Sequence, residues 1–343
     1  MRGSLLDRLW IGLIPLAMAC SSSTEIRVSG GGTLDAQPDS IMVPVADAGV
    51  ADASPSPRNP SEMGEYAVEN RSLLVPVEDG AATIGVELFL SEGADDLPLV
   101  IFTVGPLVNI DAYRGLATYF ASHGFAVGFP VYECTVWGCP VVASAATSAA
   151  VAAALVDGAS LEAIGRRISS VGYVGHFAGA SIAITAASLS REGKPVLALL
   201  PYDISVTEAV DFDAEYPDLR ERIPHVASAG LLSWRGNEAD CFTAELASRR
   251  LGISVRELPR HVHWEWRLEG TAWVDVLSEP AACVICEERC LSPSPQYDEV
   301  QRSVKTLMAA FFAQALLGED MEPWLNPEDP NLLNSFGWIS EGG

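Results

Sequence analysis

The stretch Ile168–Ser190 reads ISSVGYVGHFAGASIAITAASLS and contains three kinds of local sequence in order. Residues 168–174 form an alternating, β-branched run, which is typical of a strand. Residues 175–179 (Gly-His-Phe-Ala-Gly) are a turn flanked by glycines, and a run of small residues with helical spacing follows directly. We therefore predict a strand, a sharp turn and a helix, with the glycines leaving room for the two backbones to approach.

This order matches the frame of a nucleophile elbow, in which the pattern Gly-x-Ser-x-Gly holds a nucleophilic serine in a strained turn. Both glycines are present, as Gly175 and Gly179, but the central residue is Phe177. A phenyl ring has no lone pair to attack a carbonyl carbon and no proton for a base to remove. The sequence thus predicts the frame of a catalytic turn without its nucleophile.

The rest of the chain alternates predicted strands with predicted helices. We expect strands at 73–77, 83–90, 97–103, 125–131, 196–200, 226–234 and 253–258, helices at 112–123, 141–156, 241–250 and around 300–315, and a loop at 259–266. Strands that alternate with helices favour a mostly parallel sheet with helices on both faces. We therefore predict an α/β fold in which the first two strands make an antiparallel edge.

The overall charge excludes some partners. The 343 residues include 45 acidic and 21 basic side chains, for a net charge of −24. Such a surface repels nucleic acid, so we expect no nucleic-acid partner. The glycine-flanked turn lacks the Gly-x-Gly-x-x-Gly spacing of dinucleotide binding, and we expect no cofactor.

The N-terminus has the features of an export signal. Arg2 and Arg8 precede a short apolar stretch, Leu9–Met18, and the small residues Ala-Met-Ala stand directly before Cys20. A cysteine directly after small residues resembles a bacterial lipoprotein signal, in which that cysteine is acylated; a plain secretory signal is the alternative. The following Ser21 resembles that of outer-membrane lipoproteins, so we expect membrane contact only through this lipid anchor.

Composition divides the chain into four parts. We predict an export signal over residues 1–19, a disordered tether rich in Ser, Gly, Ala, Pro and Asp over 20–70, a folded domain over 71–320 and a C-terminal tail over 321–343. The chain is thus expected to be exported, either anchored at the outer membrane or free in the periplasm or outside the cell.

Six further cysteines favour disulfides, because an even number in an exported chain predicts a disulfide framework. Their pairing does not follow from the sequence, although the first two would close a short loop. The last three have a spacing that zinc could also use, but an oxidising compartment favours disulfides, and we expect no metal. The six are Cys134, Cys139, Cys241, Cys283, Cys286 and Cys290.

The order of these elements, with the elbow, resembles the α/β-hydrolase superfamily. It is most similar to secreted bacterial esterases of the dienelactone-hydrolase, chlorophyllase and polyester-hydrolase (cutinase-like) kind, over about Leu73–Leu317. Besides the elbow, LPLVIFTVG resembles the oxyanion strand and loop, YRGLATYFASHGFAVGFP the helix and strand that follow, and ELPRHVHWEW the histidine loop.

The resemblance implies two backbone N–H groups that stabilise the oxyanion. One is that of Ala178, after the nucleophile position, and the other belongs to the loop after residues 97–103. Aligning Gly105 with the family's glycine puts Pro106 at the second position, and proline has no N–H. A shift of one residue would make Leu107 the donor instead.

The resemblance also implies a base and an acid. His263, which is followed by an aromatic residue, and His261 are the candidate bases. Asp240, in the loop after residues 226–234, is the first candidate acid and Glu238 is the second. In family order these residues follow the nucleophile position, as in Ser, then Asp or Glu, then His.

These features together predict an exported pseudo-hydrolase that has lost its serine nucleophile and binds an ester, a lipid or a glycan. A working carboxylic-ester hydrolase with an unrecognised nucleophile is one alternative. A structural or binding protein of the cell envelope is the other.

Overall fold

The computed structural model describes most of the chain between residues 58 and 325. The described ranges are 58–77, 80–104, 108–132, 140–159, 164–190, 193–201, 222–235, 263–269, 272–282 and 293–325.

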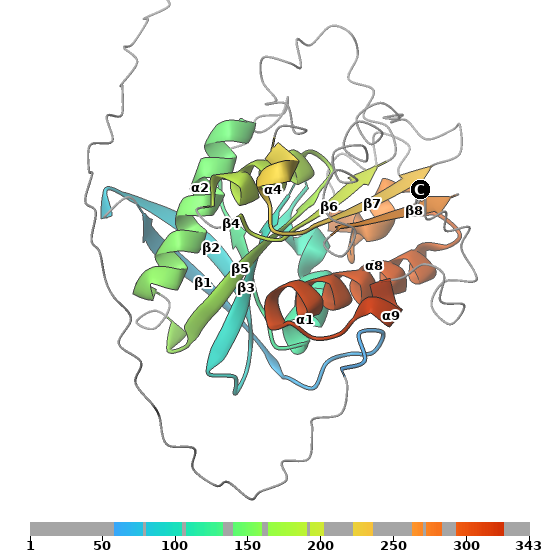
Figure 1. The fold of residues 1–343 in the computed structure, drawn as a ribbon, viewed down its shortest axis with the longest axis horizontal. Coiled ribbons are helices and arrows are strands. Elements are labelled where there is room, and N and C mark those ends of the chain that lie inside the picture. The colour runs from blue at the N-terminus through green and yellow to red at the C-terminus, as the bar shows by residue number, and fades with distance from the viewer. Residues whose placement is uncertain are drawn as a thin grey trace, which may run out of the picture. The chain divides into compact units, whose positions relative to one another are not determined.

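The described residues form a mixed sheet with the strand order β1-β2-β4-β3-β5-β6-β7-β8. The first two strands pair antiparallel with each other, and β2 pairs antiparallel with β4. Every other neighbouring pair is parallel. Figure 1 shows the sheet running through the centre of the domain, and its strands are β1 (Val68–Val77), β2 (Ala82–Ser91), β3 (Asp96–Thr103), β4 (Ala126–Pro130), β5 (Arg167–His176), β6 (Val196–Pro201), β7 (Ala229–Arg235) and β8 (His263–Glu269).

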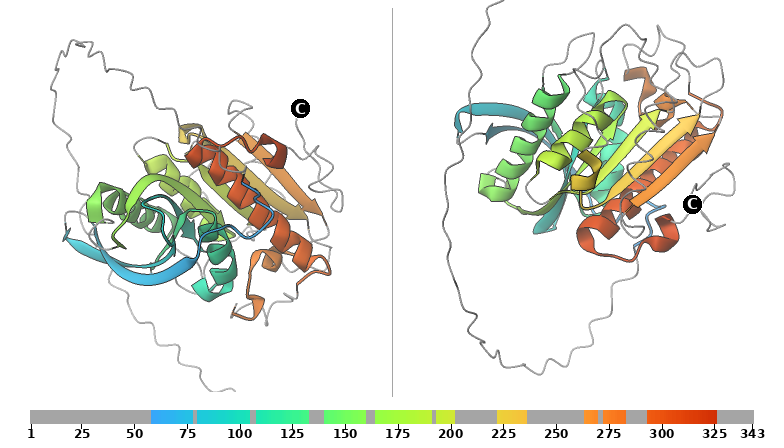
Figure 2. Two further views of the ribbon diagram at one scale, coloured as in Figure 1. Left: turned by 90° about the horizontal axis from the view of Figure 1, so that it is seen from below. Right: turned by 45° about the horizontal axis from the view of Figure 1, so that its top comes forward.

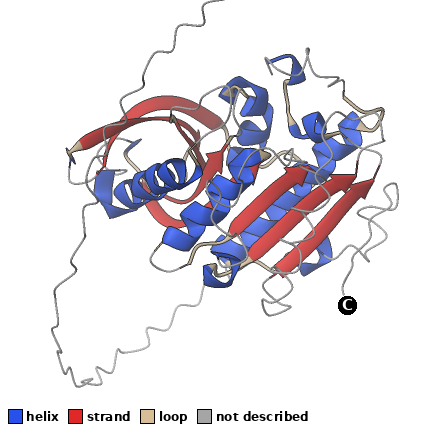
Figure 3. Cartoon of the chain, turned by 90° about the horizontal axis from the view of Figure 1, so that it is seen from above, coloured by secondary structure: helices blue, strands red, loops and turns tan. Residues whose placement is uncertain are grey.

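Helices cover both faces of this sheet (Figures 2 and 3). The helices α2 (Val141–Ala154) and α4 (Ala178–Leu189) pack on one face, where small and aliphatic side chains form one core. The helices α1 (Arg114–Ser122) and α8 (Tyr297–Phe312) pack on the other face, around a core rich in aromatic rings. Strands β3 to β6 are buried on both faces, which explains their continuous apolar runs.

The predicted α/β class and antiparallel edge are confirmed. The predicted loop at 259–266 is wrong from residue 263 onwards, because residues 263–269 form the strand β8. Trp264, Trp266 and Leu268 are buried, while His263 and Glu265 between them are partly exposed. This alternation is a strand signal that the two histidines and the loop interpretation obscured. The predicted helix 241–250 and strand 253–258 lie outside the described residues.

The folded domain extends beyond both predicted boundaries. Residues 58–67, which we assigned to a disordered tether, form an N-terminal strap that packs on α1 before β1 begins at Val68. At the other end, α9 (Glu322–Leu325) lies in the predicted tail, and the carbonyl of Leu325 accepts a hydrogen bond of 3.0 Å from the indole of Trp266.

The N-terminal strap is fastened at its start by Arg58. Its guanidinium donates two hydrogen bonds, of 3.0 and 2.9 Å, to the carboxylate of Glu319, and a third to the carbonyl of His123. The same group lies 5.7 Å from the ring centre of Phe125. Arg58 thus joins the start of the strap to the end of α1 and to the segment after α8.

The strap is also fastened along its length to the last turn of α1. The hydroxyl of Tyr119 donates to the carbonyl of Pro60 at 2.7 Å, and Nε2 of His123 lies 2.9 Å from the carbonyl of Glu62. Because a carbonyl can only accept, Nε2 of His123 carries a proton and donates it to this bond. Burial and the positive charge of Arg58 lower the pKa of His123 from 6.5 to about 4.

We predict that this histidine makes the domain sensitive to acid. The unfolded chain binds a proton at His123 below pH 6.5 while the folded chain does not until about pH 4, so the stability from this group is present above 6.5 and is lost as the pH falls to 4. The loss amounts to about 3 kcal/mol at most.

The measurement is urea unfolding of wild type and His123→Gln at pH 7 and pH 4.5. The variant should lose less stability than wild type between the two pH values, and His225→Gln, which changes an exposed histidine, should behave like wild type. Equal pH dependence of wild type and His123→Gln would contradict the prediction.

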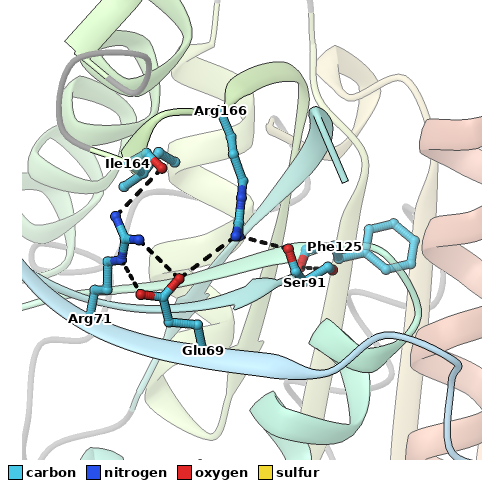
Figure 4. Close-up of polar contacts among 6 residues, drawn as sticks. All are labelled: Glu69, Arg71, Ser91, Phe125, Ile164 and Arg166. Atoms are coloured by element: carbon cyan, nitrogen blue, oxygen red, sulfur yellow. Dashed lines mark hydrogen bonds and ion pairs between the residues drawn. The ribbon is translucent and has the colours of Figure 1, made fainter. Parts of the chain in front are cut away.

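A second polar cluster fixes β1 to the turn before β5 (Figure 4). The carboxylate of Glu69 accepts hydrogen bonds of 2.5 and 3.0 Å from Arg71 and lies 3.7 Å from Arg166. Arg166 also donates to the carbonyl of Ser91 at 2.7 Å, and its side chain is 16% exposed. The neighbouring Arg167 differs, since it is 72% exposed and pairs with Asp96 on the surface.

We predict that Arg166→Met destabilises the domain by about 1–2 kcal/mol, because it removes a charge-assisted hydrogen bond from the carbonyl of the buried residue Ser91. Arg167→Met is the matched control and should cost nothing measurable, because exposed ion pairs contribute little. Urea unfolding of both variants tests this, and an equal loss in the two would contradict it.

Candidate functional site

The turn between β5 and α4 has an unusual backbone at Phe177. This residue has φ 57° and ψ −129°, and it is the one residue other than glycine with a positive φ in the described part of the chain. Side chains with a Cβ rarely adopt this conformation, and it costs about 1–3 kcal/mol. Phe177 nevertheless stays in the hydrogen-bond ladder, because its N–H donates to the carbonyl of Leu199 at 2.9 Å.

Two glycines and a threonine hold this turn in place. A Cβ on Gly175 would lie 2.2 Å from the carbonyl oxygen of Gly179, and a Cβ on Gly179 would lie 2.2 Å from that of Thr103. The buried hydroxyl of Thr103 lies 2.6 Å from the carbonyl oxygen of Gly179 and 3.2 Å from that of Val174. The end of β3 and the start of α4 are therefore in backbone contact beside the turn.

The residue before Phe177 contacts the segment that leads into α1. Nδ1 of His176 lies 2.7 Å from the hydroxyl of Tyr113, and both side chains are fully buried. Burial first, and then the nearby Tyr132, raise the pKa of Tyr113 well above its ordinary value. Tyr113 is therefore protonated at neutral pH, and its contact ties the segment before α1 to the end of β5.

Phe177 lies where open α/β sheets commonly bind ligands. The chain leaves β3 to build β4 on one side and later builds β5 and β6 on the other side, so the strand order reverses between β3 and β5. Ligands of such sheets bind outside the carboxyl ends of the strands at this reversal. Phe177 directly follows β5 at that end, and its side chain is half-buried.

The structure does not bring His263 to this edge. The register aligns His263 with Ala229, Val196 and Tyr173 in the successive neighbouring strands. Since Tyr173 precedes Phe177 by four residues and β8 is three strands from β5, His263 lies about 13 Å away along the strands and about 14 Å across them. His263 is therefore at the amino end of the parallel strands, and the structure does not support it as a base for a group at position 177.

Ala178 is the first residue of α4. The first N–H groups of a helix have no acceptor within the helix, which is compatible with the predicted donor role of Ala178. The other predicted site residues lie outside the described residues, and their roles stay predictions. They are Pro106, Leu107, Glu238, Asp240, His261, the acylation site Cys20, and the cysteines Cys134, Cys139, Cys241, Cys283, Cys286 and Cys290.

Two residues of this site were not singled out from the sequence. Thr103 ends an apolar run and gave no signal of its contact with α4. Tyr113 lies in a stretch with helical spacing, where a tyrosine is indistinguishable from an ordinary core residue. The pairing of β3 with β5 brings Thr103 to the turn, and Tyr113 reaches it from the short helical segment before α1.

The chemistry of the turn is limited by its side chains. The nearest hydroxyls along the chain are those of Tyr173, which contacts Ser190 at 2.9 Å, and Ser181, which is 6% exposed within α4. Among the described residues, no three His, Cys, Asp or Glu side chains form a group that could hold a metal ion. The arrangement therefore presents an aromatic ring and a helix N-terminus, not a nucleophile.

The chain matches no known protein-family description and no curated protein. No helix in the described ranges is long and apolar enough to cross a membrane.

We predict that Gly175→Ala destabilises the domain by at least about 1–3 kcal/mol, because the new methyl group overlaps the backbone of α4 and neither strand nor helix can move aside. Gly85→Ala in β2 is the matched control, since its Cβ meets only Val131, at 3.7 Å. Urea unfolding should show a loss at position 175 and little change at position 85, and equal losses would contradict the prediction.

Proposed function

We propose that this chain has the α/β-hydrolase fold. The support is the combination of an antiparallel start, the strand order β1-β2-β4-β3-β5-β6-β7-β8, and a strained turn between β5 and α4. In an α/β-hydrolase the nucleophile stands in that turn, at the position of Phe177. Gly175 and Gly179, on either side of this position, leave no room for a Cβ, as expected of a turn in which strand and helix backbones touch.

We propose further that the protein is a pseudo-hydrolase. The observation that carries this is Phe177 itself, which has the strained backbone of a nucleophile and a side chain that cannot attack a carbonyl. Replacing the nucleophile of a serine hydrolase lowers turnover by about 10⁶. A protein that retains this turn with a phenylalanine in it is therefore not selected for serine chemistry.

The histidines support the same conclusion. A base for this turn must come from the carboxyl edge of the sheet, in the loop after the last strand. The sequence contains no histidine after His263, which begins β8. His176 is fully buried, and its Nδ1 is occupied by the contact with Tyr113. His261 precedes β8 in the sequence and therefore does not belong to the loop after that strand; it lies outside the described residues, and the test below includes it.

What remains of a hydrolase without its nucleophile is ligand binding. Phe177 is half-buried at the carboxyl edge, at the strand reversal where open α/β sheets bind their ligands. An aromatic ring there favours contact with apolar groups. We propose that the ligand is an ester, a lipid or a glycan, bound without being cleaved.

The proposed location follows from the sequence of the first twenty residues. A basic start, a short apolar stretch and Cys20 support export and a lipid anchor. The proposal is of a binding protein held outside the cytoplasm by its N-terminus.

The test is hydrolysis of p-nitrophenyl butyrate by wild type, Phe177→Ala and Phe177→Ser. Wild type and Phe177→Ala should both show only the background rate. Phe177→Ser places a hydroxyl in the strained turn and is expected to stay slow, because His176 contacts Tyr113 and His263 lies at the other edge of the sheet. His261→Ala in the Phe177→Ser background shows whether that histidine assists.

Turnover by wild type that survives Phe177→Ala would overturn the proposal, since the nucleophile would then lie elsewhere. Binding is measured separately with a fluorescent fatty acyl probe. Wild type should bind the probe, and Phe177→Ala should bind it more weakly with unchanged thermal stability. Equal affinity of the two proteins would remove Phe177 from the binding site.

A further inference from the structure

A pocket lies between α1, α8 and the N-terminal strap, away from the strained turn. Its volume is about 430 Å³, and its lining includes Tyr119 of α1, Ser61 of the strap and the start of α8. The two helices lie side by side on one face of the sheet (Figure 2). This volume is at the lower end of the range of small-molecule sites.

One end of the pocket is acidic. Glu279 and Asp298 line it beside Tyr297, whose hydroxyl donates to the carbonyl of Leu277 at 2.8 Å. Burial first, and then the charges of Glu279, Asp275 and Asp298, raise the pKa of Tyr297. The carboxylates of Glu279 and Asp298 thus lie close enough to the Tyr297 hydroxyl for their charges to raise its pKa.

The other end of the pocket is basic. Arg302 and Lys305 follow Asp298 by four and seven residues on α8, so Lys305 is about 10 Å further along the helix axis. The ammonium of Lys305 lies 5.7 Å from the ring centre of Tyr119. Burial lowers the pKa of Lys305, and no carboxylate opposes that effect.

None of these four charged side chains forms an ion pair with another described residue. A half-buried ammonium with no ion pair to another described residue carries a desolvation cost that a bound anion would offset. Lys305 is moreover one of only two lysines in a chain of net charge −24. Such a chain offers few places for a carboxylate to bind, and this is one of them.

The two ends together restrict the ligand. A simple anion would meet Lys305 and Arg302 but would be repelled by Glu279 and Asp298, and a simple cation would have the reverse problem. A molecule with both charges, held apart by several bonds, matches both ends at once. Ordinary examples of this chemistry are ω-amino acids and short peptides.

We propose that this pocket binds a small zwitterion whose carboxylate contacts Lys305 and whose ammonium contacts Glu279. The site is separate from Phe177, and it does not depend on whether the strained turn binds a ligand. Tyr119 and Tyr297 border the two ends and provide apolar surface for the carbon chain between the charges.

The experiment is calorimetric titration of the full chain with three probes of equal length, 6-aminohexanoate, hexanoate and hexylamine. The zwitterion should bind at least about tenfold more tightly than either singly charged probe, a difference of about 1.4 kcal/mol. Lys305→Met and Glu279→Gln should each weaken 6-aminohexanoate by a similar factor. Lys194→Met removes the same charge outside the pocket and should leave the affinity unchanged.

A second measurement needs no variant. The chain has two lysines, so partial acetylation with acetic anhydride followed by mass spectrometry reports on Lys305 with Lys194 as an internal standard. The amine of 6-aminohexanoate also consumes the reagent, so the readout is the ratio of the two lysines: saturating ligand should lower acetylation of Lys305 relative to that of Lys194.

Three results would overturn the proposal. One is the absence of saturable binding by any probe. Another is equal affinity for hexanoate and 6-aminohexanoate, since the acidic end would then play no part. The third is binding of 6-aminohexanoate that Lys305→Met does not weaken and that does not protect Lys305 from acetylation.

Discussion

The fold depends on one close approach, that of the start of α4 to the ends of β3 and β5. Gly175 and Gly179 allow the backbones to touch, and Thr103 joins the carbonyls of α4 and β5 with a buried hydroxyl. Because α4 begins directly after β5, this contact sets where the helix crosses the sheet. The helix then covers the face on which α2 also packs, and its alanines permit that packing. The reversal of strand order beside it follows from the same arrangement, since β4 and β6 lie on opposite sides of β3 and β5.

The strain at Phe177 has the same origin. A phenylalanine gains nothing from φ 57°, and the surrounding contacts impose this conformation whatever side chain is present. In this protein the strained backbone is thus a property of the frame, not evidence of catalysis. The proposed binding role is compatible with it, because folding needs the frame whether or not the turn carries a nucleophile.

Much of this could be predicted from the sequence, and the reasons for the failures are physical. Buried strands such as 97–103 are continuous apolar runs, and the glycines at 175 and 179 indicate the turn between them. The strand β8 was missed because Trp264 and Trp266 beside histidines resemble a functional loop as much as an edge strand. The strap was missed because its contacts are made by Arg58 and His123, which are distant in sequence, and its composition is that of a linker. The position of His263 and the contact of Thr103 depend on strand register, which no local pattern specifies.

The strap also determines how the domain responds to a mechanical force on its N-terminus. β1 is an edge strand, and a force applied directly to its first residue would open its ladder with β2 one pair at a time. A force on the N-terminus instead acts first on Arg58. This residue is held by two hydrogen bonds to Glu319, in the segment after α8, and by one to the carbonyl of His123, at the end of α1. Tension is therefore taken up by the helical layer before it reaches the sheet. If the chain is tethered at Cys20, the strap (residues 58–67) therefore protects the pairing of β1 with β2 from a force on the tether.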